Sequence, residues 1–213
     1  MPKNSQSLNF LEIGTGPLAR LAIKINGFAN HITALDIYPQ VIKEMQKNIK
    51  QKGLEKRITP ILSKEKTKLP FNDNEFNLIY TGWISSKLLS NPEYLDELSR
   101  VSKNDIILLM PGINGDFPEM IDLIKKENEK SKRIELKDFM TNYLQEKGYK
   151  IDTTKQTTLR LDFQKKQTIQ QTMYCMDFDN SLTENQKQTL NNFLNPKTRN
   201  FKDNLYIFHA WKE

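Results

Sequence analysis

Residues 11–17 have the sequence Leu11-Glu12-Ile13-Gly14-Thr15-Gly16-Pro17, an apolar run that stops at two closely spaced glycines. The run begins at Leu8, and beyond Pro17 apolar residues recur with helical spacing up to Ile25. This pattern predicts a strand, a tight turn and a helix. Glycines at such a turn let a ligand approach the backbone without a Cβ in the way, so we expect a ligand at this crevice.

The alternation of strand and helix continues through the first half of the chain. Ile32 to Leu35 forms a second apolar run closed by Asp36, and Pro39 opens a helix that stops before Gly53. Proline at the start and glycine just past the end are usual helix boundaries. Further strands are expected at 58–62, 76–80 and 106–110, with a helix at 92–101. The order predicts an α/β fold with three layers, a mostly parallel, doubly wound sheet covered by helices on both faces.

The second half of the chain is less regular. Helices are expected at 117–130 and 136–147, and strands at 149–152, 159–163, 173–178 and 205–211. Thr183 and Gln186 have the spacing of a capping box before a short helix that reaches Phe193. Because we find no internal repeat and no low-complexity linker, we expect a single domain over residues 1–213, with residues 164–204 inserted before the last strand.

Two roles are open for this insertion. Met173, Tyr174, Met176 and Phe178 are suited to a lid over an apolar substrate. Alternatively, residues 164–204 add strands to the sheet or form a dimer interface. We also expect the loops around 85–91 and 112–117 to border the substrate, since ligands bind at the carboxyl ends of parallel strands.

Two classes of ligand fit the glycine turn. Residues 14–19 satisfy the dinucleotide fingerprint G-x-G-x-x-G/A, with Asp36 at a suitable distance for a ribose hydroxyl. Glu12, two residues before the first glycine, favours the other class, because a carboxylate there would repel the pyrophosphate of a dinucleotide.

The acid-x-Gly-x-Gly pattern of residues 12–16 resembles the first motif of class I S-adenosylmethionine-dependent methyltransferases. Residues 34–37 resemble the second motif of that family, 69–79 the stretch leading into its fourth strand, and 94–101 the helix before its fifth strand. The resemblance implies S-adenosylmethionine as the cofactor. It also implies that Glu12 lies near the cationic methionine end and that Asp36 accepts the ribose hydroxyls.

The cofactor-binding residues implied by this resemblance are Glu12, Gly14, Thr15, Gly16, Asp36, Ile37, Ser63, Thr81 and Trp83. Three positions depart from the family pattern. Leu18 replaces the third glycine, and Asn77 replaces an aspartate at a position that we interpret as structural. After the third strand the usual acid is absent, which leaves Ser63, or Glu65 after a one-residue shift, to accept a hydrogen bond from adenine.

The sequence identifies no catalytic residue. Alignment of the acceptor with an activated methyl group can supply about 7 to 11 kcal/mol of the acceleration, so a missing catalytic signature is no objection. The available bases, His31, His209, Tyr38 and Tyr174, have no supporting context. Residues 80–83 also lack the Asn/Asp-Pro-Pro-aromatic tetrapeptide of methyltransferases that act on base amines.

Composition narrows the partners. The net charge of +6 comes mostly from lysines, while arginine is scarce, so a small-molecule acceptor is preferred to RNA or protein. The lone Cys175 provides neither a disulfide nor a zinc site, and we expect no metal. No apolar run is long enough for a membrane span and no secretory signal is visible, so the expected location is cytoplasmic. A homodimer, a non-catalytic methyltransferase-like module and a dinucleotide-dependent oxidoreductase remain open alternatives.

Overall fold

The computed structural model describes residues 7–63, 65, 67–82, 84, 86–125, 129–153, 156–161, 182–195 and 201–212. The chain divides into two compact units. The first unit comprises Met1–Met110, Leu136–Lys155 and Ile207–Glu213, and the second comprises Pro111–Glu135 and Gln156–Tyr206. The single domain expected from the sequence stays a prediction.

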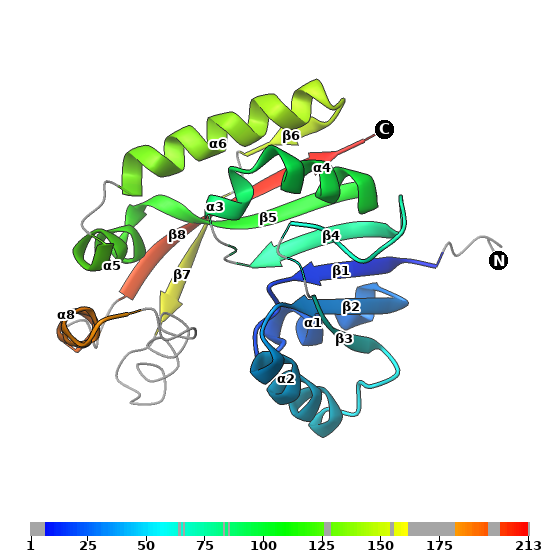
Figure 1. The fold of residues 1–213 in the computed structure, drawn as a ribbon, viewed down its shortest axis with the longest axis horizontal. Helices are drawn as coiled ribbons and strands as arrows, with labels where there is room; N and C mark the ends of the chain where they lie inside the picture. The colour runs from blue at the N-terminus through cyan, green and yellow to red at the C-terminus, as the bar shows by residue number, and fades with distance from the viewer. Residues whose placement is uncertain are drawn as a thin grey trace. The chain divides into compact units, whose positions relative to one another are not determined.

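Parallel strands form most of the sheet in the first unit (Figure 1). They are β1 (Asn9–Ile13), β2 (His31–Asp36), β3 (Ile58–Leu62), β4 (Phe76–Gly82) and β5 (Ser102–Gly115), in the order β3-β2-β1-β4-β5. The order reverses at β1, so the carboxyl ends of β1 and β4 form a switch point, where open α/β sheets bind ligands. The expected mostly parallel α/β fold is confirmed.

Helices lie on both faces of this sheet because the chain runs from β1 toward β3 on one side and from β4 toward β5 on the other. The helices are α1 (Arg20–Ile25), the short η1 (Asn26–Phe28), α2 (Pro39–Gln51), α3 (Ser86–Leu89) and α4 (Pro92–Val101). Right-handed crossovers toward β3 and toward β5 place α1 and α2 on one face and α4 on the other. Figure 1 shows α2 beside β2 and β3, and α4 beside β4 and β5.

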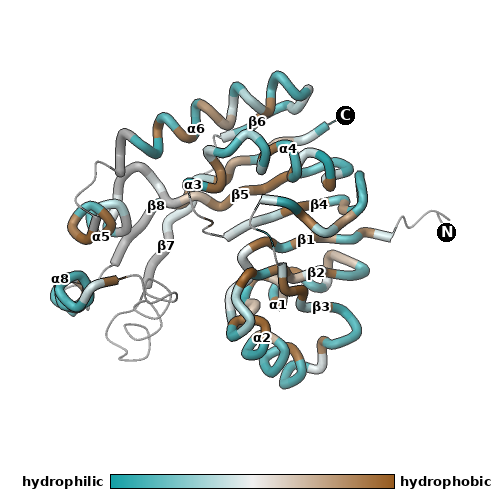
Figure 2. Tube along the Cα trace, viewed as in Figure 1, coloured by the Kyte–Doolittle hydropathy of each residue, from teal (hydrophilic) through white to brown (hydrophobic). Residues whose placement is uncertain are grey.

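Local sequence explains the helix boundaries. Pro39 begins α2 and Gly53, with φ of +66°, follows its end. The side chain of Asn91 caps α4 by accepting a hydrogen bond from the Glu93 N–H at 2.9 Å. Hydrophilic and hydrophobic residues alternate along α2 (Figure 2), and the hydrophobic residues form one buried face of the helix. That buried face consists of Val41, Ile42, Met45 and Ile49.

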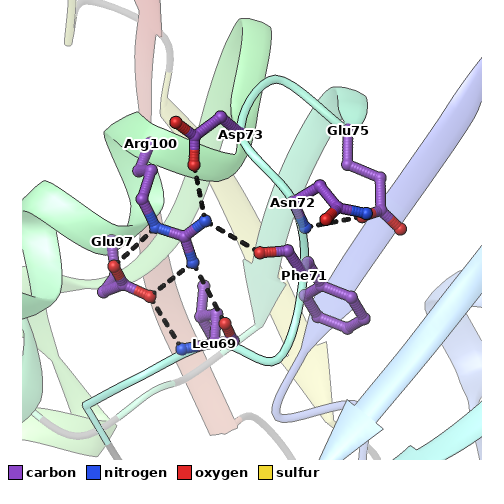
Figure 3. A network of polar contacts seen from close by, with 7 residues as sticks. All are labelled: Leu69, Phe71, Asn72, Asp73, Glu75, Glu97 and Arg100. Atoms are coloured by element: carbon purple, nitrogen blue, oxygen red, sulfur yellow. Dashed lines mark hydrogen bonds and ion pairs between the residues drawn. The ribbon is translucent and has the colours of Figure 1, made fainter.

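A polar network joins α4 to the loop that leads into β4 (Figure 3). The Arg100 guanidinium binds both carboxylate oxygens of Glu97, at 2.6 and 2.7 Å, and donates to the carbonyl groups of Leu69 and Phe71 at 3.0 and 2.8 Å. It also pairs with Asp73 at 2.9 Å. The ion pair holds the pKa of Glu97 below its usual range. Two stretches that are separate motifs in the sequence are therefore one structural unit.

Antiparallel strands complete the sheet of the first unit. Strand β6 (Lys150–Asp152) pairs with the end of β8 (Phe201–Trp211), and α6 (Glu129–Glu146) precedes β6. His209 Nε2 lies 2.7 Å from Asp105 Oδ1.

None of the helices in the described part of the chain is long and apolar enough to cross a membrane.

The second unit has its own apolar cluster between α5 (Asp116–Lys125) and α8 (Glu184–Leu194). The cluster consists of Met120, Ile121, Ile124, Leu190 and Leu194. The capping box predicted at Thr183 and Gln186 is confirmed, and the Gln186 side chain also donates to the Ile124 carbonyl at 3.1 Å. Strand β7 (Gln156–Leu161) pairs antiparallel with β8.

The expected loop at 112–117 is wrong, because β5 continues to Gly115 and α5 begins at Asp116. Gly112 serves a close backbone approach rather than a turn, since a Cβ there would collide with Asn204. Helix α6 also begins at Glu129, before the expected start at Leu136. The strand and lid expected at 173–178 lie outside the described residues, so the role of residues 164–204 stays a prediction.

Candidate functional site

The glycine turn after β1 has the backbone that only glycine adopts easily. Gly14 and Gly16 have φ of +69° and +71°. The Gly14 and Thr15 N–H groups donate to the Leu35 carbonyl at 2.9 and 3.2 Å, which ties the turn to the end of β2. A Cβ built on either glycine would meet no atom within 4 Å. The space above the turn is therefore open, as a closely approaching ligand requires.

Asp36 lies beside this turn, at the end of β2. Its carboxylate accepts hydrogen bonds from the Gly16 N–H at 3.1 Å and the Tyr38 N–H at 3.2 Å. Burial raises the pKa of Asp36, and hydrogen bonds from the backbone of Gly16, Tyr38 and Ile37 oppose that rise. The carboxylate thus has a set orientation before any ligand binds.

Glu12 is almost completely buried in β1, with 3% of its surface exposed. The Tyr80 hydroxyl of β4 donates to its Oε2 at 3.1 Å. Burial raises the pKa of Glu12 to about 8, against hydrogen bonds from Tyr80 and the backbone of Ala22, while the nearby Asp36 raises it further. Burial together with the adjacent carboxyl also raises the pKa of Tyr80.

Tyr80 is not among the site residues predicted from the sequence. The parallel pairing of β1 with β4 places Glu12 opposite Tyr80. This register depends on strands far apart in the chain, so no local pattern indicated the contact. A tyrosine after the apolar pair Leu78 and Ile79 was the available signal.

The remaining expected site residues are distributed around the same strand ends. Thr81 is fully buried, and its hydroxyl has no hydrogen-bond partner within the described part of the chain. The Ser63 N–H donates to the Asp36 carbonyl at 2.9 Å, while its hydroxyl donates to the Glu65 carbonyl at 2.7 Å. The Thr15 hydroxyl donates to the Glu12 carbonyl at 3.3 Å. Ile37 is half-buried, and Trp83 lies outside the described residues.

The strand pairing brings most of these residues to one edge of the sheet. Glu12 pairs with Ala34 and Tyr80, and Ile13 pairs with Thr81, so β1, β2 and β4 end together beside the glycine turn. His31 begins β2, opposite Asn9, and is therefore at the other edge. The contact of His209 with Asp105 agrees with a structural role for that histidine.

This arrangement suits a ligand that carries both hydroxyl groups and a positive charge. The open glycine turn admits the ligand, Asp36 offers a carboxylate acceptor for hydroxyls, and Glu12 offers a carboxyl group to a cation. Among the described residues no group of three or more His, Cys, Asp or Glu side chains is arranged to hold a metal ion.

Comparison with known proteins points to one family. A family model described as a methyltransferase domain matches residues 4–173. No curated protein sequence matches the chain significantly.

Solved structures share the fold at low sequence identity. A protein from Bacillus halodurans C-125, assigned as a methyltransferase, is 15% identical with a TM-score of 0.59, and the match covers 97% of this chain and 94% of that one. Phosphoethanolamine N-methyltransferase 2 of Haemonchus contortus, solved with S-adenosylhomocysteine, is 13% identical with a TM-score of 0.56, over 98% of this chain and 49% of that one. The [4+2]-cyclase SpnF is 13% identical with a TM-score of 0.59, over 97% and 74% of the respective chains.

Proposed function

The chain belongs to the methyltransferase-domain family, and from this premise we propose that it transfers a methyl group from S-adenosylmethionine to a small-molecule acceptor. The observation that carries the proposal is the pair of acids beside the open glycine turn. Glu12 is the penultimate residue of β1 and Asp36 is the last residue of β2, so both lie at the carboxyl ends of adjacent parallel strands, where open α/β sheets bind ligands.

The cofactor-binding roles follow from the chemistry of each side chain. The Asp36 carboxylate accepts the ribose hydroxyls, and Ile37 packs on the adenine ring. The Ser63 hydroxyl donates to the Glu65 carbonyl and keeps its lone pairs to accept a hydrogen bond from the adenine amino group. Glu12 and Thr81 border the methionine side, and the family resemblance assigns the same role to Trp83, which lies outside the described residues. The turn formed by Gly14, Thr15 and Gly16 lets the ligand approach the backbone.

When bound, S-adenosylmethionine supplies a methyl group on a positively charged sulfur that is already activated for displacement. The protein's own contribution is to bind, orient and exclude water. Asp36 is held by Gly16 and Tyr38, so the ribose acceptor is oriented in advance. Such orientation can account for about 7 to 11 kcal/mol of rate acceleration, so we assign no general base.

A small-molecule acceptor is favoured by the distribution of charge. On α2 the lysines Lys43, Lys47 and Lys50 are solvent-exposed, and Lys47 pairs with Glu44 at 2.8 Å. This is the pattern of a solvated helix surface rather than of a groove for nucleic acid. Activity that is insensitive to salt would support this acceptor class, whereas a steep loss of activity with salt would favour RNA.

A second candidate is a methyltransferase-like protein that binds the cofactor but performs another reaction. The specific observation is that the [4+2]-cyclase SpnF shares the fold. A dinucleotide-dependent oxidoreductase is disfavoured by the match of residues 4–173 to the methyltransferase-domain family model.

The test is calorimetric titration of the purified protein with S-adenosylmethionine, S-adenosylhomocysteine and NADH. We expect micromolar binding of the first two and none of NADH. An Asp36→Asn variant should bind both ligands more weakly, because it lacks the charge and, since Gly16 and Tyr38 donate to different carboxylate oxygens, also loses one of these two hydrogen bonds. Binding of NADH alone would refute the proposal, and binding of S-adenosylmethionine without methyl transfer to any class of acceptor would favour the second candidate.

A further inference from the structure

The hydrogen bond from the Tyr80 hydroxyl to Glu12 joins two buried side chains of adjacent strands, and the proposed methyl transfer assigns it no role. We propose that Tyr80 is a positioning residue that holds the Glu12 carboxyl group to receive the ammonium or sulfonium group of the ligand, so that binding of the cation releases a proton. This inference rests on the proposed function, because it concerns the same site.

The geometry leaves Glu12 little freedom. Glu12 and Tyr80 are paired on adjacent parallel strands, and each is 3% exposed. The Tyr80 hydroxyl holds one carboxyl oxygen, Oε2, at 3.1 Å. One oxygen therefore has a set partner from β4, and the carboxyl group has a defined orientation at the end of β1.

The surroundings of Glu12 contain no compensating positive charge. The groups that act on it from the neighbouring elements are the Tyr80 hydroxyl of β4, the Asp36 carboxyl of β2 and the backbone of Ala22 in α1. No cationic side chain in the described part of the chain is among them. A buried carboxylate without a counter-charge is costly, so the carboxyl group is mostly protonated at neutral pH.

A cationic ligand reverses this balance. As the ammonium or sulfonium group arrives, the O–H bond of Glu12 breaks, the carboxylate remains beside the cation, and the proton leaves to solvent. The Tyr80 hydroxyl supports this change, since a donor to the carboxylate favours the charged form. A ligand without a cation, such as adenosine, leaves Glu12 protonated and releases no proton.

Calorimetric titration with S-adenosylhomocysteine tests the inference. Titrations in buffers of different ionisation enthalpy give the number of protons released. At pH 7 the wild-type protein should release about 0.9 proton per ligand, from a carboxyl pKa of about 8 in the free protein. Release should fall to about 0.5 proton at pH 8, where the ligand still carries its ammonium group, and should be absent with adenosine.

Three variants distinguish a positioning role of the Tyr80 hydroxyl from a general effect of losing a buried hydroxyl group. Tyr80→Phe should weaken S-adenosylhomocysteine binding about tenfold at pH 7, through loss of a hydrogen bond to a charged group, and should move the pH dependence of affinity upward. Tyr94→Phe is the matched control, because Tyr94 is equally buried in α4 and its hydroxyl has no partner in the described part of the chain. It should bind with wild-type affinity and an unchanged pH profile. Glu12→Gln should bind without releasing a proton.

The outcomes are distinct. If wild type binds S-adenosylhomocysteine but Tyr80→Phe has the same affinity and pH profile, the inference is wrong and the proposed function stands. Binding without proton release by the wild-type protein also overturns the inference. If wild type binds neither S-adenosylmethionine nor S-adenosylhomocysteine, the proposed function fails and the inference fails with it.

Discussion

Replacing Glu12 by glutamine should change how the stability of the protein depends on pH. The pKa of Glu12 rises from 4.5 to about 8 on folding, mainly through burial. A raised carboxyl pKa contributes stability that is complete below pH 4.5 and is lost as the pH rises through 8. The free energy of unfolding of the wild-type protein should therefore fall across this window, by about 1.4 kcal/mol per pH unit and at most about 5 kcal/mol in total.

Glu12→Gln removes the ionisation but keeps an oxygen that accepts the Tyr80 hydroxyl. The variant should match the wild-type free energy of unfolding near pH 5 and exceed it near pH 9. Urea denaturation followed by circular dichroism at pH 5, 6, 7, 8 and 9 measures the difference. Glu97→Gln is an instructive control, because the pKa of Glu97 is lowered and its contribution is instead lost as the pH falls. A constant difference between wild type and Glu12→Gln across the series would refute the reasoning.

Three further changes test the site and its support. Asp36→Ala should weaken cofactor binding by about 1 to 3 kcal/mol through a lost charged hydrogen bond, whereas Tyr94→Phe should leave calorimetric affinity unchanged. Gly14→Val should cost about 1 to 2 kcal/mol of stability from its left-handed backbone and should abolish cofactor binding, so a variant that still binds would place the ligand elsewhere. Arg100→Lys should lower the free energy of unfolding by about 1 to 3 kcal/mol, because lysine cannot reproduce the paired contacts with Glu97; an unchanged urea midpoint would show that the network adds nothing.

Features with local causes could be predicted from the sequence. The glycine turn follows from the need for positive φ at Gly14 and Gly16, and the start of α8 from the reciprocal bonds of Thr183 and Gln186. Asn77, interpreted as structural, accepts a hydrogen bond from the Asn9 N–H at 3.0 Å. In the glycine turn and at the start of α8 the decisive residues are close in sequence, whereas the partner of Asn77 lies 68 residues away and was not predicted.

Features that depend on distant residues could not be predicted. The partner of Glu12 follows from the register between β1 and β4, which no single segment specifies. The sequence suggested a loop at 112–117, but Gly112 lies within β5, where its missing side chain makes room for Asn204. The contacts of Arg100 with Leu69 and Phe71 likewise required the folded chain.

The most direct test of the central claim is a crystal structure of the protein with S-adenosylhomocysteine. The account predicts the ligand above Gly14 and Gly16, with its ribose hydroxyls on the Asp36 carboxylate and its ammonium group facing Glu12. A ligand bound away from this turn, or with its ribose remote from Asp36, would contradict the account.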